Sequence, residues 1–453
     1  MVKNISRRAF LKITGFLGLS NLFFLSGCSE SQATQERSVD MTGQAENILY
    51  DGIFPKHNPI GEGVGVMPGR VVWNYEPDSV NWTSGYWWEN KNFDEPKIKS
   101  MIDETITSIG GGENSKSSWE NMFKHFNHQH GKGNVGYIQG EKIAIKPNMN
   151  GHGWNGANDE RTTESFITPI LLKNFLLSLV EDGSVPTECI TIYEVTRNLP
   201  SFMVSLCTQG RLQGVKIEDT RNSKADFNAP IKWSKNFNGE KSYLPTCVTQ
   251  ADYLINFASL KGHTMNGVTL TAKNHFGSLV NSDRLSAPMT AGLHPFVVAD
   301  GMNKYSVLVD LISNPQLGGK TLLYILDALI AFPSEVARSS ADNSNTKWLS
   351  APFNGGFTAS IFMSQDPIAI DSVGTDFLMN EPTLQKYNSA IRNNPNVENY
   401  LHEATANLTK YLNDNGQPIK NLGVHEHWNN PLEKKYSRNL GKTEGIELIQ
   451  LLG

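Results

Sequence analysis

Four basic side chains, Lys261, His263, Lys273 and His275, lie within fifteen positions of one another among glycine, threonine and asparagine. A carboxylate follows only at Asp283, whereas an ordinary solvated surface mixes both signs of charge. Cations gathered without carboxylates indicate an anionic ligand, or a lysine whose pKa is lowered by a neighbour. A solvated basic loop is the alternative, and the apolar sequence around the stretch argues against it.

A second polar segment begins with the residues IKPN and continues through a loop rich in glycine and asparagine over 149–163. A loop of this length after a strand is more often functional than a plain connection. We expect Lys146 to pair with a carboxylate or phosphate, and His152 to act as a base or ligand. Asn148 and Asn150 offer hydrogen-bond donors and acceptors. Alternatively, Lys146 extends along the surface and the asparagines form turns.

Three aspartates lie in or beside apolar runs. Asp327 lies in the middle of the apolar run 322–331, and a buried carboxylate needs a lysine, a metal or hydrogen-bond donors as partners. Asp366 precedes Pro367, a pattern typical of a helix N-cap and first turn. Asp371 follows on the early turns of the same predicted helix. Asp327 and Asp371 are therefore candidates for orienting a base or a lysine.

Two His-x-His pairs occur, His128 with His130 and His425 with His427. In an extended segment, residues two apart share one face, so each pair would present two imidazoles together, as a metal site requires. Such pairs also occur in loops that bind no metal, so both interpretations stay open.

Alternating elements begin near residue 141 and must position these residues. Predicted strands cover 142–146, 190–195, 253–258, 322–330 and 360–363, with another starting at 215; predicted helices cover 169–179, 202–207 and 397–412, with another starting near 367. This alternation predicts an α/β fold, with a mixed or mostly parallel sheet and helices on both faces. Ligands bind at the carboxyl ends of strands in such sheets, so we expect the two polar segments to meet at one edge.

The N-terminal sequence SRRAFLK resembles a twin-arginine export signal, and apolar residues 13–25 lead to LSGC, which resembles a lipoprotein cleavage box ending at Cys28. The expected product is an exported lipoprotein anchored through lipidated Cys28 on the periplasmic or outer face of the cell envelope. Its expected partners are the membrane, the twin-arginine export machinery and a small-molecule ligand. The net charge of −5 and pI near 6.1 give no support for nucleic-acid binding.

The patterns divide the chain into five parts. These are a signal peptide at 1–27, a flexible tether at 28–45, an irregular aromatic-rich N-terminal layer at 46–140, the α/β core at 141–380, and a C-terminal helix and tail at 381–453 packed on the core. The layer contains two amphipathic stretches, at 95–109 and 117–126.

The remaining cysteines, Cys189, Cys207 and Cys247, lack the spacing of a cysteine metal site. An iron–sulfur cluster held by cysteines is therefore not expected, while a divalent metal bound by other residues is an open alternative. In an oxidising compartment the three thiols allow one disulfide and one free thiol, or three free thiols.

Several short motifs, in order, resemble the bacterial domain of unknown function 362 family. They are IKPNMN at 145–150, TT at 162–163, ITIYEV at 190–195, DYLINFASLKGH at 252–263, GVTLTAKNHFG at 267–277, LYILDAL at 323–329 and QDPIAIDSVG at 365–374. The resemblance covers roughly residues 140–380 and implies an α/β domain, with no substrate. Many members carry a ferredoxin-like cysteine cluster, and this chain has none.

These residues predict an enzyme that acts on a small anionic or carbonyl-containing substrate, with a metal as an optional participant. Lys261 and Lys273, with Lys146, Asn148 and Asn274, would bind the substrate. His263 or His275 would act as general acid or base, and Asp327 or Asp371 would orient a base or lysine. The alternatives are a lipid-tethered binding or cofactor-maturation protein without catalysis, and a structural lipoprotein whose basic residues pair with Asp327, Asp371 and Glu194.

Overall fold

The described residues form one compact unit. The computed structural model describes residues 57–150, 165–235, 242–264, 266–281, 304–335, 343–388, 396–406, 408–413 and 416–453, together with 293, 297 and 394. The expected signal peptide, Cys28, the tether, His152 and the TT motif lie outside the described residues. Within the described chain, no helix has the length and apolarity needed to cross a bilayer.

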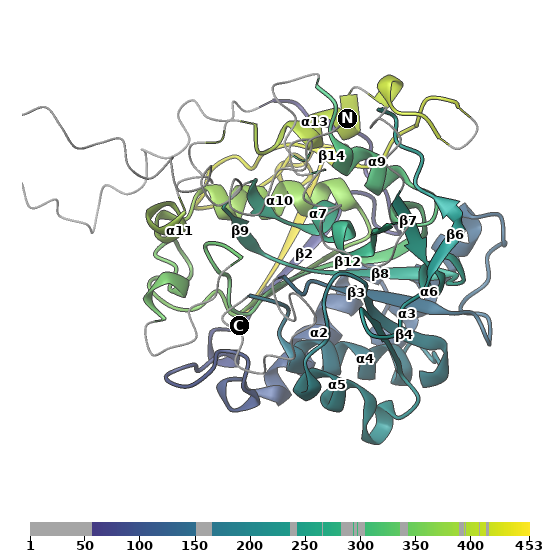
Figure 1. Ribbon diagram of the computed structural model, residues 1–453. Helices are drawn as coiled ribbons and strands as arrows, with labels where there is room; N and C mark the ends of the chain where they lie inside the picture. The colour runs from purple at the N-terminus through teal and green to yellow at the C-terminus, as the bar shows by residue number, and fades with distance from the viewer. Residues whose placement is uncertain are drawn as a thin grey trace, which may run out of the picture. The chain divides into compact units, whose positions relative to one another are not determined.

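An eight-stranded sheet forms the centre of this unit (Figure 1). Its order is β15 (Glu447–Leu452), β2 (Arg70–Tyr75), β13 (Ser360–Ser364), β12 (Thr321–Ala328), β8 (Tyr253–Ser259), β3 (Ile143–Pro147), β4 (Ile190–Glu194) and β5 (Lys216–Asp219). Among these eight strands β13 alone runs antiparallel to its neighbours. The predicted mostly parallel α/β sheet is therefore confirmed.

Helices cover both faces of the sheet (Figure 1). On one side lie α2 (Glu95–Gly110), α3 (Ser115–Gln129), α4 (Pro169–Glu181) and α5 (Ser201–Thr208); on the other lie α7 (Thr271–Asn274), α9 (Val307–Ser313), α10 (Pro367–Met379) and α13 (Asn399–Ala406). The side chain of Asp366 caps α10 by accepting hydrogen bonds from the amides of Ile368 and Ala369, as its position before Pro367 predicts.

Smaller elements complete the described fold. They are β1 (Ile60–Gly61) paired with β14 (Val424–His425), β9 (Lys261–His263) paired with β10 (Gly267–Thr269), the three strands β6 (Ala225–Pro230), β7 (Ser242–Pro245) and β11 (Val280–Asn281), and the helices α6 (Thr246–Thr249) and α11 (Pro382–Tyr387). The β1–β14 pair joins segments that are far apart in the sequence, and this pairing matters for the histidines described below.

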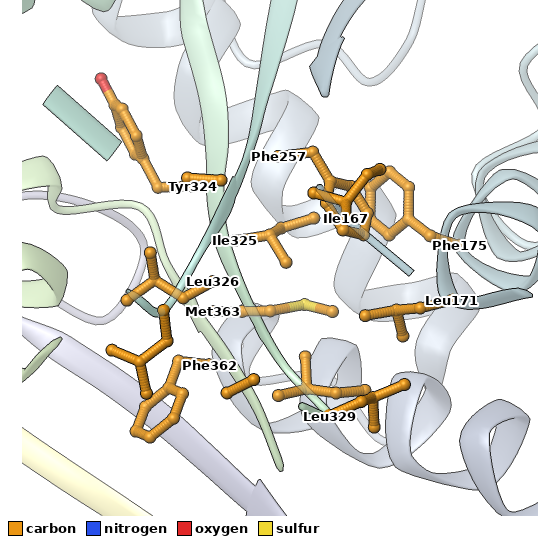
Figure 2. Packing of buried hydrophobic residues seen from close by; sticks show 14 of the residues in the cluster. Ile167, Leu171, Phe175, Phe257, Tyr324, Ile325, Leu326, Leu329, Phe362 and Met363 are labelled. Carbon is orange, nitrogen blue, oxygen red and sulfur yellow. The ribbon is translucent and has the colours of Figure 1, made fainter. Parts of the chain in front are cut away.

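Side chains alternate between the two faces of the central strands (Figure 2). Ile325 of β12 and Met363 of β13 point towards Leu171 of α4, whereas Leu326 and Phe362 point to the opposite side. All of these residues are buried. Because strand residues alternate with a period of two, a run that is apolar throughout indicates a strand buried on both faces.

Most predicted elements begin and end within three residues of those observed. One predicted helix differs more, and several observed elements, including α9 and α11, were not predicted. The predicted helix at 397–412 is shorter, since α13 ends at Ala406 and a separate 3-10 turn, Leu408–Lys410, follows. The N-terminal layer contributes β2 to the central sheet. The apolar C-terminal piece forms β15 at its edge. Sequence patterns missed β2 and β15 because their pairing joins the two ends of the unit.

Candidate functional site

A group of buried polar side chains lies at the carboxyl ends of β3, β4 and β8. Lys146 and Asn256 are register partners on the parallel strands β3 and β8, so their side chains project from the same face of the sheet. Helix α7 and the turn after it pack against these strands and contribute two more polar residues. We call this group the strand-end cluster; it consists of Lys146, Asn148, Glu194, Asn256, Asn274 and His275.

Three asparagines connect the cluster through their amides. Asn274 Nδ2 donates to the Lys146 carbonyl at 2.9 Å and to Asn256 Oδ1 at 2.8 Å. Asn256 Nδ2 in turn donates to the Thr271 carbonyl at 2.9 Å, and Asn148 Nδ2 donates to Asn274 Oδ1 at 3.3 Å. Each amide bridges two chain segments, so the network holds α7 against the sheet edge in one orientation.

Lys146 forms a buried ion pair with Glu194. The Lys146 Nζ atom lies 2.5 Å from Glu194 Oε2 and 2.7 Å from the Pro147 carbonyl. Burial lowers the pKa of Lys146, and the Glu194 charge opposes this shift. A Cβ atom at Gly277 would lie 2.5 Å from Lys146 Nζ, so any other residue at this position would displace the ion pair.

His275 is a neutral imidazole held by one hydrogen bond. Its Nε2 atom accepts from Asn256 Nδ2 at 3.1 Å, which places the ring proton on Nδ1. Burial, and then the charge of Lys146, lower the pKa of His275 to about 3. Its Nδ1 atom is buried and has no hydrogen-bond partner among the described residues. His275 therefore offers an N–H donor rather than a base.

Lys273 lies on α7, two residues before His275. Burial lowers its pKa to about 8; Glu335 opposes the shift and Arg197 adds to it. Its Nζ atom lies 5.1 Å from the centre of the Phe276 ring. An amine with this pKa gains and loses a proton near physiological pH, unlike an ordinary lysine.

The other two predicted basic residues have structural contacts in a different place. Lys261 Nζ donates to the Ser165 carbonyl at 2.9 Å and to the Ser165 hydroxyl at 3.0 Å, at the segment that leads into α4. The His263 Nδ1 atom accepts from the Asn266 amide at 3.3 Å, within the β9–β10 hairpin. The structure places both residues on β9, after the end of β8.

Asp327 and Asp371 accept hydrogen bonds from backbone amides and hydroxyls. Asp327 accepts from the amides of Thr168, at 2.5 Å, and Leu329, at 3.0 Å, and burial raises its pKa. Asp371 accepts from the Thr271 amide and hydroxyl, the Ala272 amide and the Tyr400 hydroxyl, and burial raises its pKa to about 6. Asp371 thus fixes the first turn of the helix that carries Lys273.

The two His-x-His pairs have different surroundings. His128 lies in α3, and His130 caps that helix with its Nδ1 atom 2.7 Å from the Phe126 carbonyl, so this pair is not extended. His425 lies in the extended strand β14, and His427 follows it. Both are buried. His57, His402 and Glu398 lie close to them.

Sequence patterns did not single out His57, Glu398 or His402. Glu398 and His402 are four residues apart at the start of α13, a spacing that puts two side chains on one helix face. That spacing was a usable signal inside the predicted helix 397–412. No comparable signal existed for His57, whose neighbours are more than 300 positions away in the sequence.

Cys189, Cys207 and Cys247 are all free thiols. This matches the alternative of three free thiols.

Comparison with known proteins agrees with the motifs. Residues 143–376, more than half of the chain, match the family model described as domain of unknown function (DUF362). No curated protein matches the chain. The strand-end cluster lies inside the matched segment, whereas His57, Glu398, His402, His425 and His427 lie outside it. By this match the chain belongs to the DUF362 family.

Proposed function

We propose that this protein is an enzyme that acts on a small anionic or carbonyl-containing substrate at the strand-end cluster and the adjoining Lys273. The observation that carries the proposal is the buried Nδ1 atom of His275, which has no hydrogen-bond partner among the described residues. Lys273 lies two residues away on the chain, and burial lowers its pKa to about 8. A lysine with this pKa serves as an acid–base group, or as a nucleophile towards a carbonyl carbon. Its position on α7 is fixed by Asp371, which holds the first turn of that helix.

The charges around this amine favour an anionic substrate. Arg197 lowers the pKa of both Lys146 and Lys273, so its charge acts on both lysines. Two carboxylates, Glu194 and Glu335, act in the opposite direction. Lys146, Lys273 and Arg197 bring positive charge to this edge of the sheet, and such charge would attract a carboxylate or phosphate group.

His275 supplies a suitable partner for a carbonyl oxygen. The N–H of the neutral His275 imidazole has no acceptor among the described residues. Such a group stabilises negative charge that develops on an oxygen, without giving up its proton. We therefore assign Lys273 the proton-transfer or nucleophilic role and His275 the donor role.

The test is a thermal-shift screen of small carboxylates, 2-oxo acids and inorganic phosphate. We expect at least one of them to stabilise the wild type, and Lys273→Met to bind it about tenfold or more weakly. Lys320→Met is the matched control, because burial also lowers the pKa of Lys320 to about 8. Its Nζ atom donates to the carbonyls of Val248, Thr249 and Ala251. No stabilising compound, or equal losses in both variants, would contradict the proposal.

A binding or maturation protein without catalysis is the second candidate. It is favoured by the contacts of Asp327 and Asp371, neither of which hydrogen bonds to a lysine or histidine side chain in the described chain. Incubating any compound from the screen with the protein and following it by NMR separates the two candidates, since a binding protein leaves it unchanged.

We also propose that the protein is exported by the twin-arginine route and anchored through Cys28, on the basis of SRRAFLK and LSGC. Metabolic labelling with radioactive palmitate tests this. We expect a labelled membrane-fraction protein, and loss of the label in Cys28→Ser and of export in Arg7→Lys/Arg8→Lys. A wild-type protein without label would exclude the lipid anchor.

A further inference from the structure

Four histidines and one glutamate from separate segments meet beside α10. His57 lies just before β1, and His425 lies in β14 opposite Ile60 of β1. Glu398 directly precedes α13, and His402 lies in the first turn of that helix. The nearest ligand atoms within each of two triads, His57–His425–His427 and Glu398–His402–His425, lie within 4.8 Å of one another. We call these five residues the histidine cluster.

The distances between ligand atoms match those around a shared cation. His402 Nε2 and His425 Nε2 are 3.3 Å apart. Glu398 Oε2 is 2.8 Å from His427 Nε2 and 3.9 Å from His425 Nε2. Two nitrogens bound at about 2.0–2.1 Å to one tetrahedral metal ion are separated by roughly 3.3–3.4 Å. Two imidazole nitrogens this close need a proton or a metal between them, because their lone pairs repel.

The other ring nitrogen of two of these histidines is held from outside the cluster. His427 Nδ1 lies 2.7 Å from Asp376 Oδ1, and His425 Nδ1 lies 2.8 Å from Ser372 Oγ. Asp376 and Ser372 are one turn apart on α10. Metal-binding histidines commonly have this arrangement, in which a carboxylate or other acceptor on one nitrogen orients the opposite nitrogen towards the ion.

His57 provides an independent sign of a missing partner. Its Nδ1 atom lies 2.7 Å from the Asn58 carbonyl. Its Nε2 atom is buried and has no hydrogen-bond partner among the described residues. A buried ring nitrogen without a partner is costly, and an ion bound between the rings would satisfy it.

We propose that His57, Glu398, His402, His425 and His427 bind a divalent transition-metal ion. Four imidazole nitrogens and one carboxylate oxygen suit zinc, iron, cobalt, nickel or copper, whereas magnesium and calcium prefer oxygen ligands. The site is distinct from the strand-end cluster and lies outside the segment that matches the family, so it is a feature of this chain beyond its DUF362 core. An ion here also joins residue 57 to α13 and β14.

The test uses the full-length chain, purified without a histidine tag and depleted of metal with a chelator. It is titrated with Zn²⁺ against a chromophoric competitor and with Co²⁺ by visible absorption. We expect one ion per chain, Co²⁺ bands typical of nitrogen-rich coordination, and a higher melting temperature with metal. His402→Gln and His57→Gln should each weaken binding about tenfold or more.

His128→Gln is the control variant and should bind metal like the wild type. Circular dichroism of the metal-free variants shows whether each one folds. If the His402 variant does not fold, the His57 variant still tests the proposal. His57 is half-buried, so replacing it should disturb the interior least. Substoichiometric binding by the wild type, wild-type affinity in both cluster variants, or an equal loss in His128→Gln would overturn the proposal.

Discussion

The strand-end cluster and the histidine cluster both gather buried polar groups, but they satisfy them differently. In the strand-end cluster, amides and one ion pair already bond most of the polar atoms within the protein. In the histidine cluster, acceptors on α10 hold the Nδ1 atoms of His425 and His427, while the Nε2 atoms of both rings lie within 4 Å of Glu398 Oε2. The first arrangement suits a rigid site for an organic ligand, and the second suits a cation.

Helix α10 contacts both clusters. Asp371 on this helix fixes α7, which carries Lys273, while Ser372 and Asp376 hold the two histidines. Variants at each cluster therefore show whether the two are independent.

The largest expected effect comes from removing one partner of the buried ion pair. Lys146→Met leaves Glu194 charged and buried, so the free energy of unfolding should fall by about 3–5 kcal/mol. Urea denaturation followed by tryptophan fluorescence measures this. Lys99→Met removes an exposed pair with Asp103 and should cost at most about 0.5 kcal/mol. A Lys146→Met loss as small as that of the control would mean that the pair is not buried as described.

The second-largest effect is expected for Asp376→Asn, which should affect the histidine cluster and leave the strand-end cluster unchanged. The change removes the negative charge beside His427 Nδ1 and should weaken metal binding about 10- to 100-fold. Binding of a small anion at Lys273 should be unchanged. Zn²⁺ competition and the thermal-shift assay measure the two effects. An equal weakening of both would show that α10 couples the clusters.

His275 of the strand-end cluster should make the free energy of unfolding depend on pH. Its pKa is lowered to about 3 in the folded protein, below the ordinary value of 6.5, so the unfolded chain binds a proton that the folded one does not. The contribution of neutral His275 to the free energy of unfolding is therefore fully present above pH 6.5, and it is lost as the pH falls towards 3. Between pH 6 and 4, His275→Gln should reduce the slope of the free energy of unfolding against pH by up to about 1 kcal/mol per pH unit. Urea denaturation at several pH values measures it, and an unchanged slope would count against a neutral, buried His275.

The smallest expected effect is at the other His-x-His pair. His130 has its ring nitrogens 2.7 Å from the carbonyls of Phe126 and Gly319. His130→Gln should lower the free energy of unfolding by about 1 kcal/mol and leave metal binding unchanged. Loss of metal in this variant would place a site at the end of α3 instead of beside α10.

The sequence by itself determined the strands of the core and the edge at which they place their polar residues. Apolar runs such as 253–258 end where polar residues begin, and parallel strands bring their carboxyl ends together. Lys146, Asn274 and His275 therefore meet as the patterns predict. The types of these residues did not reveal their roles, because burial and neighbours determine the pKa of each group.

Only the tertiary structure decided which charges pair and which histidines meet. Lys146 and Glu194 lie on adjacent strands and form an ion pair, while Lys261, from the same basic stretch as Lys273, bonds to Ser165 instead. His57 and His425 meet because β1 pairs with β14 across most of the chain. Contacts of this kind depend on strand pairing between distant segments, and local residue patterns carry no information about such pairing.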